Sequence, residues 1–305
     1  MTTISPATPT PEPGLLASLN RRPARTPFLA AAMQNTLVPL ITYDGARLEA
    51  HGQSVPKDHV GGDLVDFVAD GRDVIAYVAD VSGHGLHAGV LMGMIKTAMR
   101  YGLLLRQPLA KLLEDLNVVL QAVKEPNMFA TLAALRFDAS NHVEYISAGH
   151  VPLLHYRQRY GDVVLYSMPQ FPLGLFPRAG YTGRRIPYES GDLFAIVTDG
   201  VVELGEDQDA ETGLERLATI LSELPGRPLS DIAAAIYTTI QRPIQEDDQT
   251  VLLLRAAAEN HAIDDTNADT NAVPGQPDDV NPNSESLDAR WRKLLDELAA
   301  ELARD

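Results

Sequence analysis

The chain of 305 residues has a formal net charge of −16 at pH 7, and 45% of its residues are hydrophobic, which allows one large globular domain or two small ones. The negative charge argues against nucleic acid or an anionic membrane surface as the main partner. Because the chain contains no cysteine, a disulfide framework, a thiolate metal site and a cysteine nucleophile are all excluded.

The N-terminal part of the chain reads as two short regions. Residues 1–27 contain six prolines and predict a disordered leader that lacks the apolar stretch of a signal peptide. Residues 28–45 follow as a linker helix, because apolar side chains recur there at helical spacing up to Leu40. No apolar run in the chain approaches the 20 residues or so of a membrane helix, so we expect a cytoplasmic protein without a membrane partner.

Residues 46–257 form the predicted main domain. Its helices and strands are grouped rather than alternating, which favours an α+β fold with antiparallel sheets over repeated strand-helix-strand units. In chain order the patterns predict strands within 46–81, helices at 86–105 and 109–123, strands at 128–137, 142–147, 152–157, 162–167 and 193–198, helices within 213–241 and a strand at 251–254.

The remaining residues differ from this domain. Residues 258–283 are rich in Asn, Asp and Pro and predict a disordered acidic linker. Residues 284–305 predict an amphipathic helix, which could pack on its own domain, pair with its copy in a homodimer or bind another protein. Its apolar stripe consists of Leu287, Trp291, Leu294, Leu295, Leu298 and Leu302.

The segment Asp80-Val81-Ser82-Gly83-His84-Gly85 lies between a predicted strand and a predicted helix. Turns of this kind commonly carry functional side chains. The two glycines allow the backbone to approach a ligand closely, so carbonyl groups of the turn can point into a site beside the carboxylate of Asp80. Such oxygen ligands suit Mg²⁺ or Mn²⁺.

Further acids lie at the ends of apolar runs. They are Asp63 after two glycines, Asp199 before a glycine, and the adjacent pair Asp247 and Asp248. A single aspartate beside a glycine is most often part of a turn. Several carboxylates gathered at strand ends would instead repel one another unless a cation lay between them, so together they indicate a divalent metal site.

Five motifs occur in the order and approximate spacing of a known family. They are Gly61-Gly62-Asp63, Asp80-Val81-Ser82-Gly83-His84-Gly85, Tyr145-Ile146-Ser147-Ala148-Gly149-His150, Thr198-Asp199-Gly200-Val201-Val202-Glu203 and Asp247-Asp248-Gln249-Thr250. Between Phe28 and Arg255 the chain resembles the SpoIIE/RsbU-like serine phosphatases, the bacterial branch of the metal-dependent (PPM, type 2C) protein phosphatases. The resemblance implies a four-layer α-β-β-α sandwich in which two antiparallel sheets pack face to face.

The resemblance also implies a site for two Mn²⁺ or Mg²⁺ ions. Asp80 would bridge the ions, with the carbonyl of Val81 contributing to their coordination. Asp199 and Asp247 would hold one ion, and Asp63 would support the other.

Several assignments within this site stay open. Asp66 and Asp248 are alternative metal ligands, because each lies close to another acid in its motif. His84 either donates a proton to the leaving oxygen or supports the turn. His150 is interpreted as structural.

The implied activity is hydrolysis of phosphoserine or phosphothreonine on a partner protein. By resemblance the substrate is a phosphorylated STAS-domain anti-sigma-factor antagonist in a partner-switching pathway, and an upstream regulator protein would control the enzyme. Two alternatives are a catalytically silent scaffold that binds the same partner and a hydrolase of small phosphate esters. No arginine matches the phosphate-binding arginine of the eukaryotic enzymes, which makes the small-ester alternative less attractive.

Overall fold

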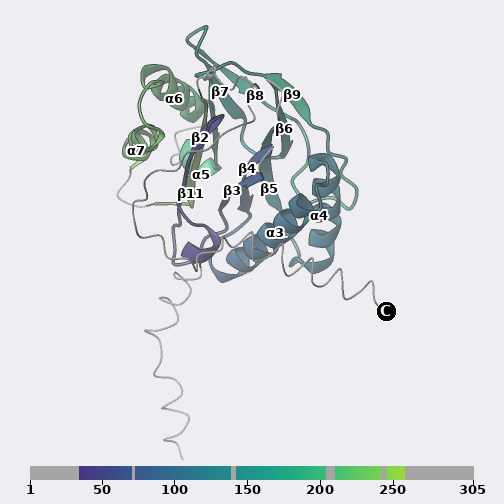
Figure 1. Ribbon diagram of the computed structural model, residues 1–305. Helices are drawn as coiled ribbons and strands as arrows, with labels where there is room; N and C mark the ends of the chain where they lie inside the picture. Colours follow the sequence, from purple (N-terminus) through teal and green to yellow (C-terminus); the bar gives the residue numbers. More distant parts are fainter. Residues whose placement is uncertain (1–33, 71–72, 139–141, 204–209, 242–244, 258–305) are drawn as a thin grey trace, which may run out of the picture. The chain divides into compact units, whose positions relative to one another are not determined.

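The computed structural model describes residues 34–70, 73–138, 142–203, 210–241 and 245–257. Within this part the chain forms two antiparallel sheets that pack face to face, with helices on the outer side of each sheet (Figure 1). The predicted leader, the acidic linker and the C-terminal helix lie outside the described residues. The four-layer α+β fold expected from the sequence is confirmed.

The six-stranded sheet joins the two ends of the domain. Strand β11, the last of the domain, pairs with β2 on one side and with β10 on the other. In spatial order the strands are β1 (Ile41–Asp44), β2 (Leu48–Val55), β11 (Gln249–Ala256), β10 (Leu193–Val197), β7 (Leu153–Arg157) and β8 (Asp162–Tyr166).

The five-stranded sheet is built almost entirely from consecutive strands. Each strand pairs antiparallel with its neighbour in the sheet. In spatial order they are β3 (Leu64–Asp70), β4 (Asp73–Val81), β5 (Ala130–Phe137), β6 (His142–Ala148) and β9 (Arg184–Pro187). Short connections join β3 to β4 and β5 to β6, whereas two helices lie between β4 and β5.

The outer layers consist of two helix pairs. Helices α3 (Leu86–Leu104) and α4 (Leu109–Val123) cover the five-stranded sheet, and α6 (Ala210–Glu223) and α7 (Leu229–Ile240) cover the six-stranded sheet (Figure 1). A single short helix, α5 (Asp199–Val202), follows β10 directly. Proline immediately precedes both α4 and α7, where its fixed φ and missing N–H are tolerated.

Strand β10 shows how the layers divide the core. Leu193, Ala195 and Val197 belong to the apolar cluster beneath α6 and α7, whereas Phe194 and Ile196 belong to the cluster between the two sheets. Successive side chains of a strand point to opposite faces, so a strand buried on both faces reads as a continuous apolar run. This burial holds the residues that follow β10 in a fixed position.

Most predicted elements are confirmed, with one correction. Residues 41–44, placed in the linker helix at 28–45, form strand β1, and the described helical turn ends at residue 37. Pro39 disfavours a helix across this point, and Ile41, Thr42 and Tyr43 have side chains that suit a strand. The short elements β9 and α5 were not predicted.

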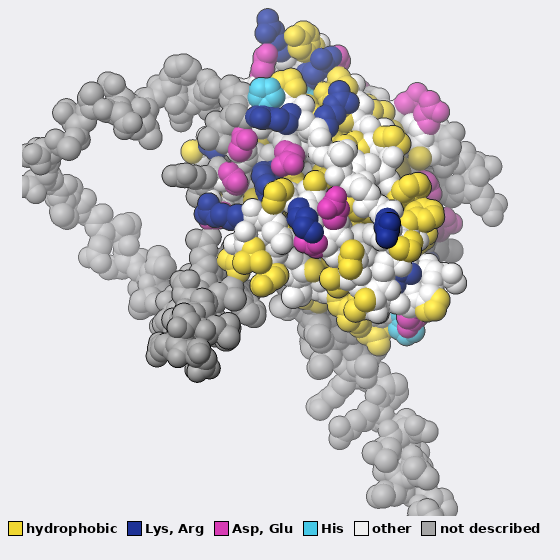
Figure 2. All heavy atoms as spheres, turned by 90° about the vertical axis from the view of Figure 1, so that its right-hand side faces the viewer, with side chains coloured by type: hydrophobic (Ala, Val, Ile, Leu, Met, Phe, Trp, Pro, Cys, Tyr) yellow, Lys and Arg dark blue, Asp and Glu magenta, His cyan; other side chains and the backbone are white. Residues whose placement is uncertain are grey.

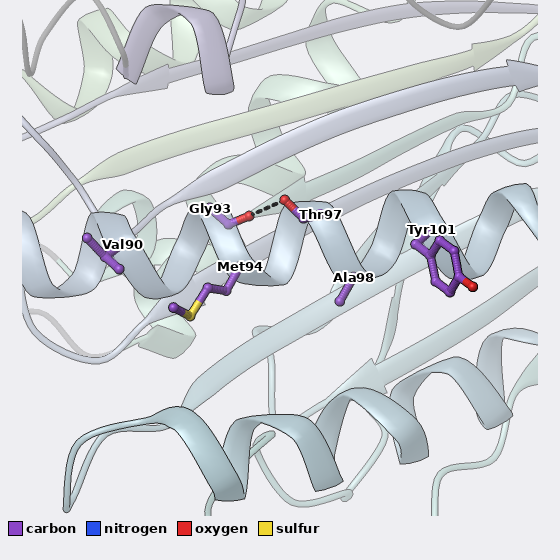
Figure 3. A pocket seen from close by; sticks show the side chains of 6 residues that line it. All are labelled: Val90, Gly93, Met94, Thr97, Ala98 and Tyr101. Atoms are coloured by element: carbon purple, nitrogen blue, oxygen red, sulfur yellow. Dashed lines mark hydrogen bonds between the residues drawn. The ribbon is translucent and has the colours of Figure 1, made fainter. Parts of the chain in front are cut away.

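The outer face of α3 carries exposed apolar side chains. A shallow groove of about 510 Å³ follows this face, and Figure 3 shows Val90, Met94, Ala98 and Tyr101 along it. No lining side chain is a carboxylate or an imidazole. The groove therefore offers no residues for the predicted metal chemistry.

One face of the described part is chemically mixed (Figure 2). On the face shown in Figure 2, hydrophobic, basic and acidic side chains are interspersed rather than gathered into one field of a single charge. Within the described residues, no helix combines the length and apolarity that crossing a membrane requires.

Candidate active site

The predicted acids lie at one end of the sandwich. Asp63 directly precedes β3 and Asp80 is the penultimate residue of β4, and these two strands pair antiparallel, so both acids lie at the same edge of the five-stranded sheet. Asp199 follows β10 and Asp247 precedes β11. These strands also pair antiparallel, which brings the second pair of acids to one edge of the six-stranded sheet.

Two threonine hydroxyls connect the edges of the two sheets. Thr198 Oγ1 and Thr250 Oγ1 both donate hydrogen bonds to Asp63 Oδ2, at 2.8 and 2.6 Å. All three side chains are buried. The two hydroxyls therefore hold the Asp63 carboxylate against the strands that carry Asp199 and Asp247.

The carboxylates of the two sheets repel one another. Burial raises the pKa of Asp80 to about 7, and the charges of Asp199, Asp247 and Asp248 add to this effect. Burial raises the pKa of Asp63 well above its usual range, with the charge of Asp80 contributing. Burial and the charge of Asp247 also raise the pKa of Asp199. These groups would be stabilised in their charged form by a cation close to them.

The backbone of the Asp80 turn is arranged for close approach. Gly83 and Gly85 have φ angles of 90° and 79°, which favour glycine. A Cβ atom on Gly62 would lie 2.7 Å from the carbonyl oxygen of Val81. The Gly-Gly-Asp motif therefore needs glycine here to lie against the carbonyl group that we predict to be a metal ligand.

His84 lies on the exposed side of this turn. Its Nδ1 is 3.1 Å from Asp58 Oδ2, and both side chains are more than half exposed. When Nδ1 donates its proton to Asp58, Nε2 is the ring nitrogen that remains for another partner. Sequence analysis did not single out Asp58, since no motif surrounds it.

Asp247 and Asp248 are adjacent but differ in burial and in hydrogen bonding. Asp248 is 3% exposed, and its carboxylate accepts the backbone N–H groups of Lys57 and Gly62, each at 2.7 Å. Asp247 is exposed, and its Oδ1 accepts the N–H of Asp248 at 2.8 Å. The side chain of Asp247 is therefore the more accessible of the two.

Asp66 belongs to a different cluster. Both of its oxygens accept hydrogen bonds from Arg100 at 2.6 Å, Tyr77 donates to Oδ2 at 2.6 Å, and Lys96 Nζ lies 3.1 Å from Oδ1. Together these contacts hold the pKa of Asp66 below its usual range despite burial. With its charge already compensated within the protein, Asp66 is not retained as a metal ligand.

His150 lies in the buried part of the same end of the five-stranded sheet. Its Nδ1 is 2.7 Å from Thr131 Oγ1, and its backbone N–H donates to Ser147 Oγ at 3.2 Å. Burial lowers the pKa of His150 to about 4, so the ring is neutral at pH 7. These contacts agree with a structural role.

The donor atoms of the site suit a hard cation. Among the described residues, no three His, Asp or Glu side chains already stand together as a metal-binding group. The charges of Asp199 and Asp247 nevertheless act on Asp80 across the two sheets, and the carboxylate and carbonyl oxygens are ligands that Mg²⁺ and Mn²⁺ prefer. Asp63, Asp80, Asp199, Asp247 and the Val81 carbonyl therefore supply the donor chemistry that such ions prefer.

Two threonines in this site were present in the predicted motifs without an assigned role. Thr198 directly precedes Asp199, and Thr250 lies two residues after Asp248. A threonine within two residues of an acid at both strand ends is a signal that sequence analysis could have used. Both threonines donate to Asp63, which lies 187 residues from Thr250. The spacing of residues within a motif cannot predict a partner at that distance in sequence.

Comparisons with known proteins address the family directly. The family model of Stage II sporulation protein E (SpoIIE) matches residues 70–257, more than half of the chain. The chain belongs to the SpoIIE family. The assignment to SpoIIE/RsbU-like phosphatases of the PPM class made from the five motifs is thereby confirmed.

Individual relatives agree with the family assignment. Phosphoserine phosphatase RsbU of Bacillus subtilis (strain 168) is 29% identical to this SpoIIE-family chain over an alignment of 240 residues, which covers 74% of this chain and 69% of RsbU.

Solved structures share the fold. The RsbU and RsbW domains of Rv1364c from Mycobacterium tuberculosis superpose with a TM-score of 0.64 at 23% identity, over 72% of this chain and 62% of that chain. RsbX in complex with magnesium superposes with a TM-score of 0.58 at 19% identity, over 72% of this chain and all of RsbX.

Proposed function

We propose that this SpoIIE-family protein is a cytoplasmic, Mn²⁺- or Mg²⁺-dependent protein serine/threonine phosphatase. The observation that carries the proposal is the position of Asp80 at the edge of one sheet, where the charges of Asp199 and Asp247 from the other sheet act on it. The activity named for RsbU and the magnesium in RsbX support it.

The proposed site would take two divalent ions. Asp80 and the Val81 carbonyl would hold them from the five-stranded sheet, and Asp199 and Asp247 from the six-stranded sheet. When bound, such ions would lower the pKa of a water molecule and neutralise the oxygens of the transferring phosphoryl group. Asp63 would support this arrangement while it accepts hydrogen bonds from the hydroxyl groups of Thr198 and Thr250.

His84 is the proposed proton donor to the leaving serine or threonine oxygen. Its contact with Asp58 fixes which ring nitrogen faces the substrate and orients the imidazole. The exposure of His84 suits a substrate that is itself a folded protein.

For the substrate we propose a phosphorylated STAS-domain anti-sigma-factor antagonist in a partner-switching pathway. The similarity to RsbU, and to a chain in which an RsbU domain and an RsbW domain occur together, supports this assignment. An upstream regulator protein would set the activity of the phosphatase.

The test is Mn²⁺-dependent release of phosphate from a phosphoserine peptide and from p-nitrophenyl phosphate. We expect Asp80→Asn and Asp199→Asn to lower the rate at least ~100-fold, because each removes a proposed metal ligand. Asp192→Asn is the matched control, since Asp192 is a buried acid that precedes the same strand that Asp199 follows. We expect it to retain the wild-type rate.

Two results would overturn the proposal. A wild-type protein that binds no Mn²⁺ in calorimetry and releases no phosphate would indicate a phosphatase-fold scaffold. A strong preference for p-nitrophenyl phosphate and nucleotides over phosphoproteins would indicate a hydrolase of small phosphate esters.

A further inference from the structure

Asp248 is a buried acid whose two oxygens are both engaged by backbone. Oδ1 accepts the N–H of Lys57 and Oδ2 accepts the N–H of Gly62, each at 2.7 Å, and the N–H of Asp63 lies 3.4 Å from Oδ2. No lysine or arginine side chain contacts Asp248 in any hydrogen bond or ion pair found among the described residues. The carboxylate thus accepts hydrogen bonds from backbone N–H groups of a turn that lies 186 residues away in sequence.

We propose that Asp248 is a positioning residue of the metal site, which sets the distance between Asp63 and Asp247 and does not itself bind an ion. The inference rests on the proposed function and deepens it. Asp248 accepts the backbone N–H of Gly62, which is the residue before Asp63. Asp248 itself directly follows Asp247. The hydrogen bond from Gly62 to Asp248 therefore connects the residue next to Asp63 with the residue next to Asp247, and it does so between the two sheets.

The packing around Asp248 leaves it little freedom. A Cβ atom on Gly61 would lie 2.3 Å from Asp248 Oδ2, and a Cβ atom on Gly200 would lie 2.1 Å from the Asp248 carbonyl oxygen. Gly200 directly follows Asp199, so this contact places a third proposed ligand against the same residue. The glycines of two motifs are therefore explained by the space that Asp248 occupies.

A carboxylate is specifically required by these contacts. Asp248 accepts an N–H on each oxygen, whereas an asparagine would present one oxygen and one NH₂ group, and the NH₂ group cannot accept. Asp248→Asn thus loses one of the two hydrogen bonds while the side-chain volume is nearly unchanged. It is a mild test of position and not a test of packing.

The opposite end of β10 supplies a matched control. Asp192 is also 3% exposed, and it accepts the backbone N–H groups of Gln158 at 2.9 Å and Glu189 at 3.0 Å. Its Oδ2 additionally lies 2.9 Å from the buried His155 Nε2. Asp192 is not among the predicted metal-site residues. Asp192→Asn therefore replaces a buried carboxylate that accepts backbone N–H groups, at a place away from the metal site.

The experiment measures Mn²⁺ binding to the full chain by titration calorimetry, together with the Mn²⁺-induced rise in melting temperature. We expect Asp248→Asn to bind the same number of ions as wild type with about 10- to 100-fold lower affinity, the usual range for partners that orient metal ligands. Phosphate release should return close to the wild-type rate at saturating Mn²⁺. Asp247→Asn should instead lose one ion, and Asp192→Asn should bind as wild type does.

A second variant keeps the proposal testable if Asp248→Asn does not fold. Gly61→Ala places a methyl group against the Asp248 carboxylate and changes no proposed ligand, and we expect it to weaken Mn²⁺ binding in the same way.

Three results would overturn the inference. Unchanged Mn²⁺ affinity in the folded Asp248→Asn variant, or in Gly61→Ala if the first does not fold, would show that Asp248 does not position the site. Loss of one ion in Asp248→Asn with normal stoichiometry in Asp247→Asn would make Asp248 the ligand. A wild-type chain that binds no Mn²⁺ would overturn the proposed function as well, which distinguishes the two failures.

Discussion

Asp63 and Asp66 are buried acids three residues apart, yet their surroundings shift their pKa values in opposite directions. The charge of Asp80 adds to burial in raising the pKa of Asp63. Contacts with Arg100 and Lys96 lower the pKa of Asp66. The protein thus supplies cations of its own to one carboxylate and surrounds the other with further carboxylates.

The difference shows what each cluster is for. The charge of Asp66 is compensated as soon as the chain folds, because its counter-ions Arg100 and Lys96 belong to the chain itself. Since both lie on α3, Asp66 anchors this helix to the five-stranded sheet. A buried acid among other acids is costly until a cation arrives from outside. Such a cluster persists only if the rest of the fold holds it in place, as perturbed groups at functional sites commonly require.

The largest expected effect on stability concerns the cluster around Asp66, whose charge is compensated by residues of the chain itself. Asp66→Ala should lower the free energy of unfolding by about 3–5 kcal/mol, because it removes the carboxylate that Arg100, Lys96 and Tyr77 contact. Urea denaturation measures this loss. Asp162→Ala, which removes an exposed ion pair with Arg157, is the control and should leave the midpoint unchanged. Equal midpoints for both variants would contradict the comparison.

The next effect tests whether His150, at the same end of the five-stranded sheet as Asp63 and Asp80, stays uncharged. The pKa of His150 is about 4 instead of the usual 6.5, so between these pH values the unfolded chain takes up a proton that the folded chain does not. The contribution of His150 to the free energy of unfolding should therefore fall by on the order of 3 kcal/mol as the pH falls from about 6.5 to 4. The difference in free energy of unfolding between wild type and His150→Asn should change by this amount over that range, as pH-dependent urea melts measure.

An exposed histidine gives the control for this change in the free energy of unfolding with pH. His142 lies on the surface, and His142→Asn should leave the slope between pH 6.5 and 4 as it is in wild type. A His150→Asn variant with the wild-type slope would mean that the imidazole takes up its proton over the same pH range in the folded chain as in the unfolded chain, which would contradict the prediction.

A smaller effect tests the hydroxyls that surround Asp63 in place of cations. Thr250→Val removes the 2.6 Å hydrogen bond to Asp63 Oδ2 and should lower the free energy of unfolding by about 2 kcal/mol. Thr238→Val is the control, because that exposed hydroxyl bonds only within its own helix. Both variants are compared by thermal melts, and equal stability of the two would show that Asp63 does not depend on this donor.

The smallest expected effect concerns stability without metal. Asp80→Asn removes one of several repelling charges, so we expect the metal-free protein to gain about 1 kcal/mol, as is common when a strained functional group is replaced. Mn²⁺ should raise the melting temperature of wild type but no longer that of the variant. A metal-free variant less stable than wild type would contradict the claim that these carboxylates repel one another.

Sequence patterns predicted the framework of this protein well. The helices α3 and α4 follow long apolar repeats, and the acids of the site lie at strand ends that the motifs identify. The predicted linker helix runs past its observed end because the helical spacing before Pro39 obscures the strand signal of Ile41, Thr42 and Tyr43. Four-residue elements such as α5 and β9 are too short to show a period.

The roles of neighbouring acids could not be predicted, because their partners are distant in sequence. Asp66 is distinguished from Asp63 by Arg100, 34 residues later on another element. Asp248 is distinguished from Asp247 by the backbone N–H of Lys57, 191 residues earlier. Local spacing carries no record of such contacts.

Strand β11 has a consequence for how the protein is made. It lies between β2 and β10, so the two parts of the six-stranded sheet cannot join until the end of the domain has been synthesised. Non-local pairing of this kind slows folding, because the intervening chain must be closed into a loop first. During synthesis β2 therefore presents an open strand edge that other chains could pair with. Activity and protection from aggregation are both acquired only when the last strand of the domain is in place.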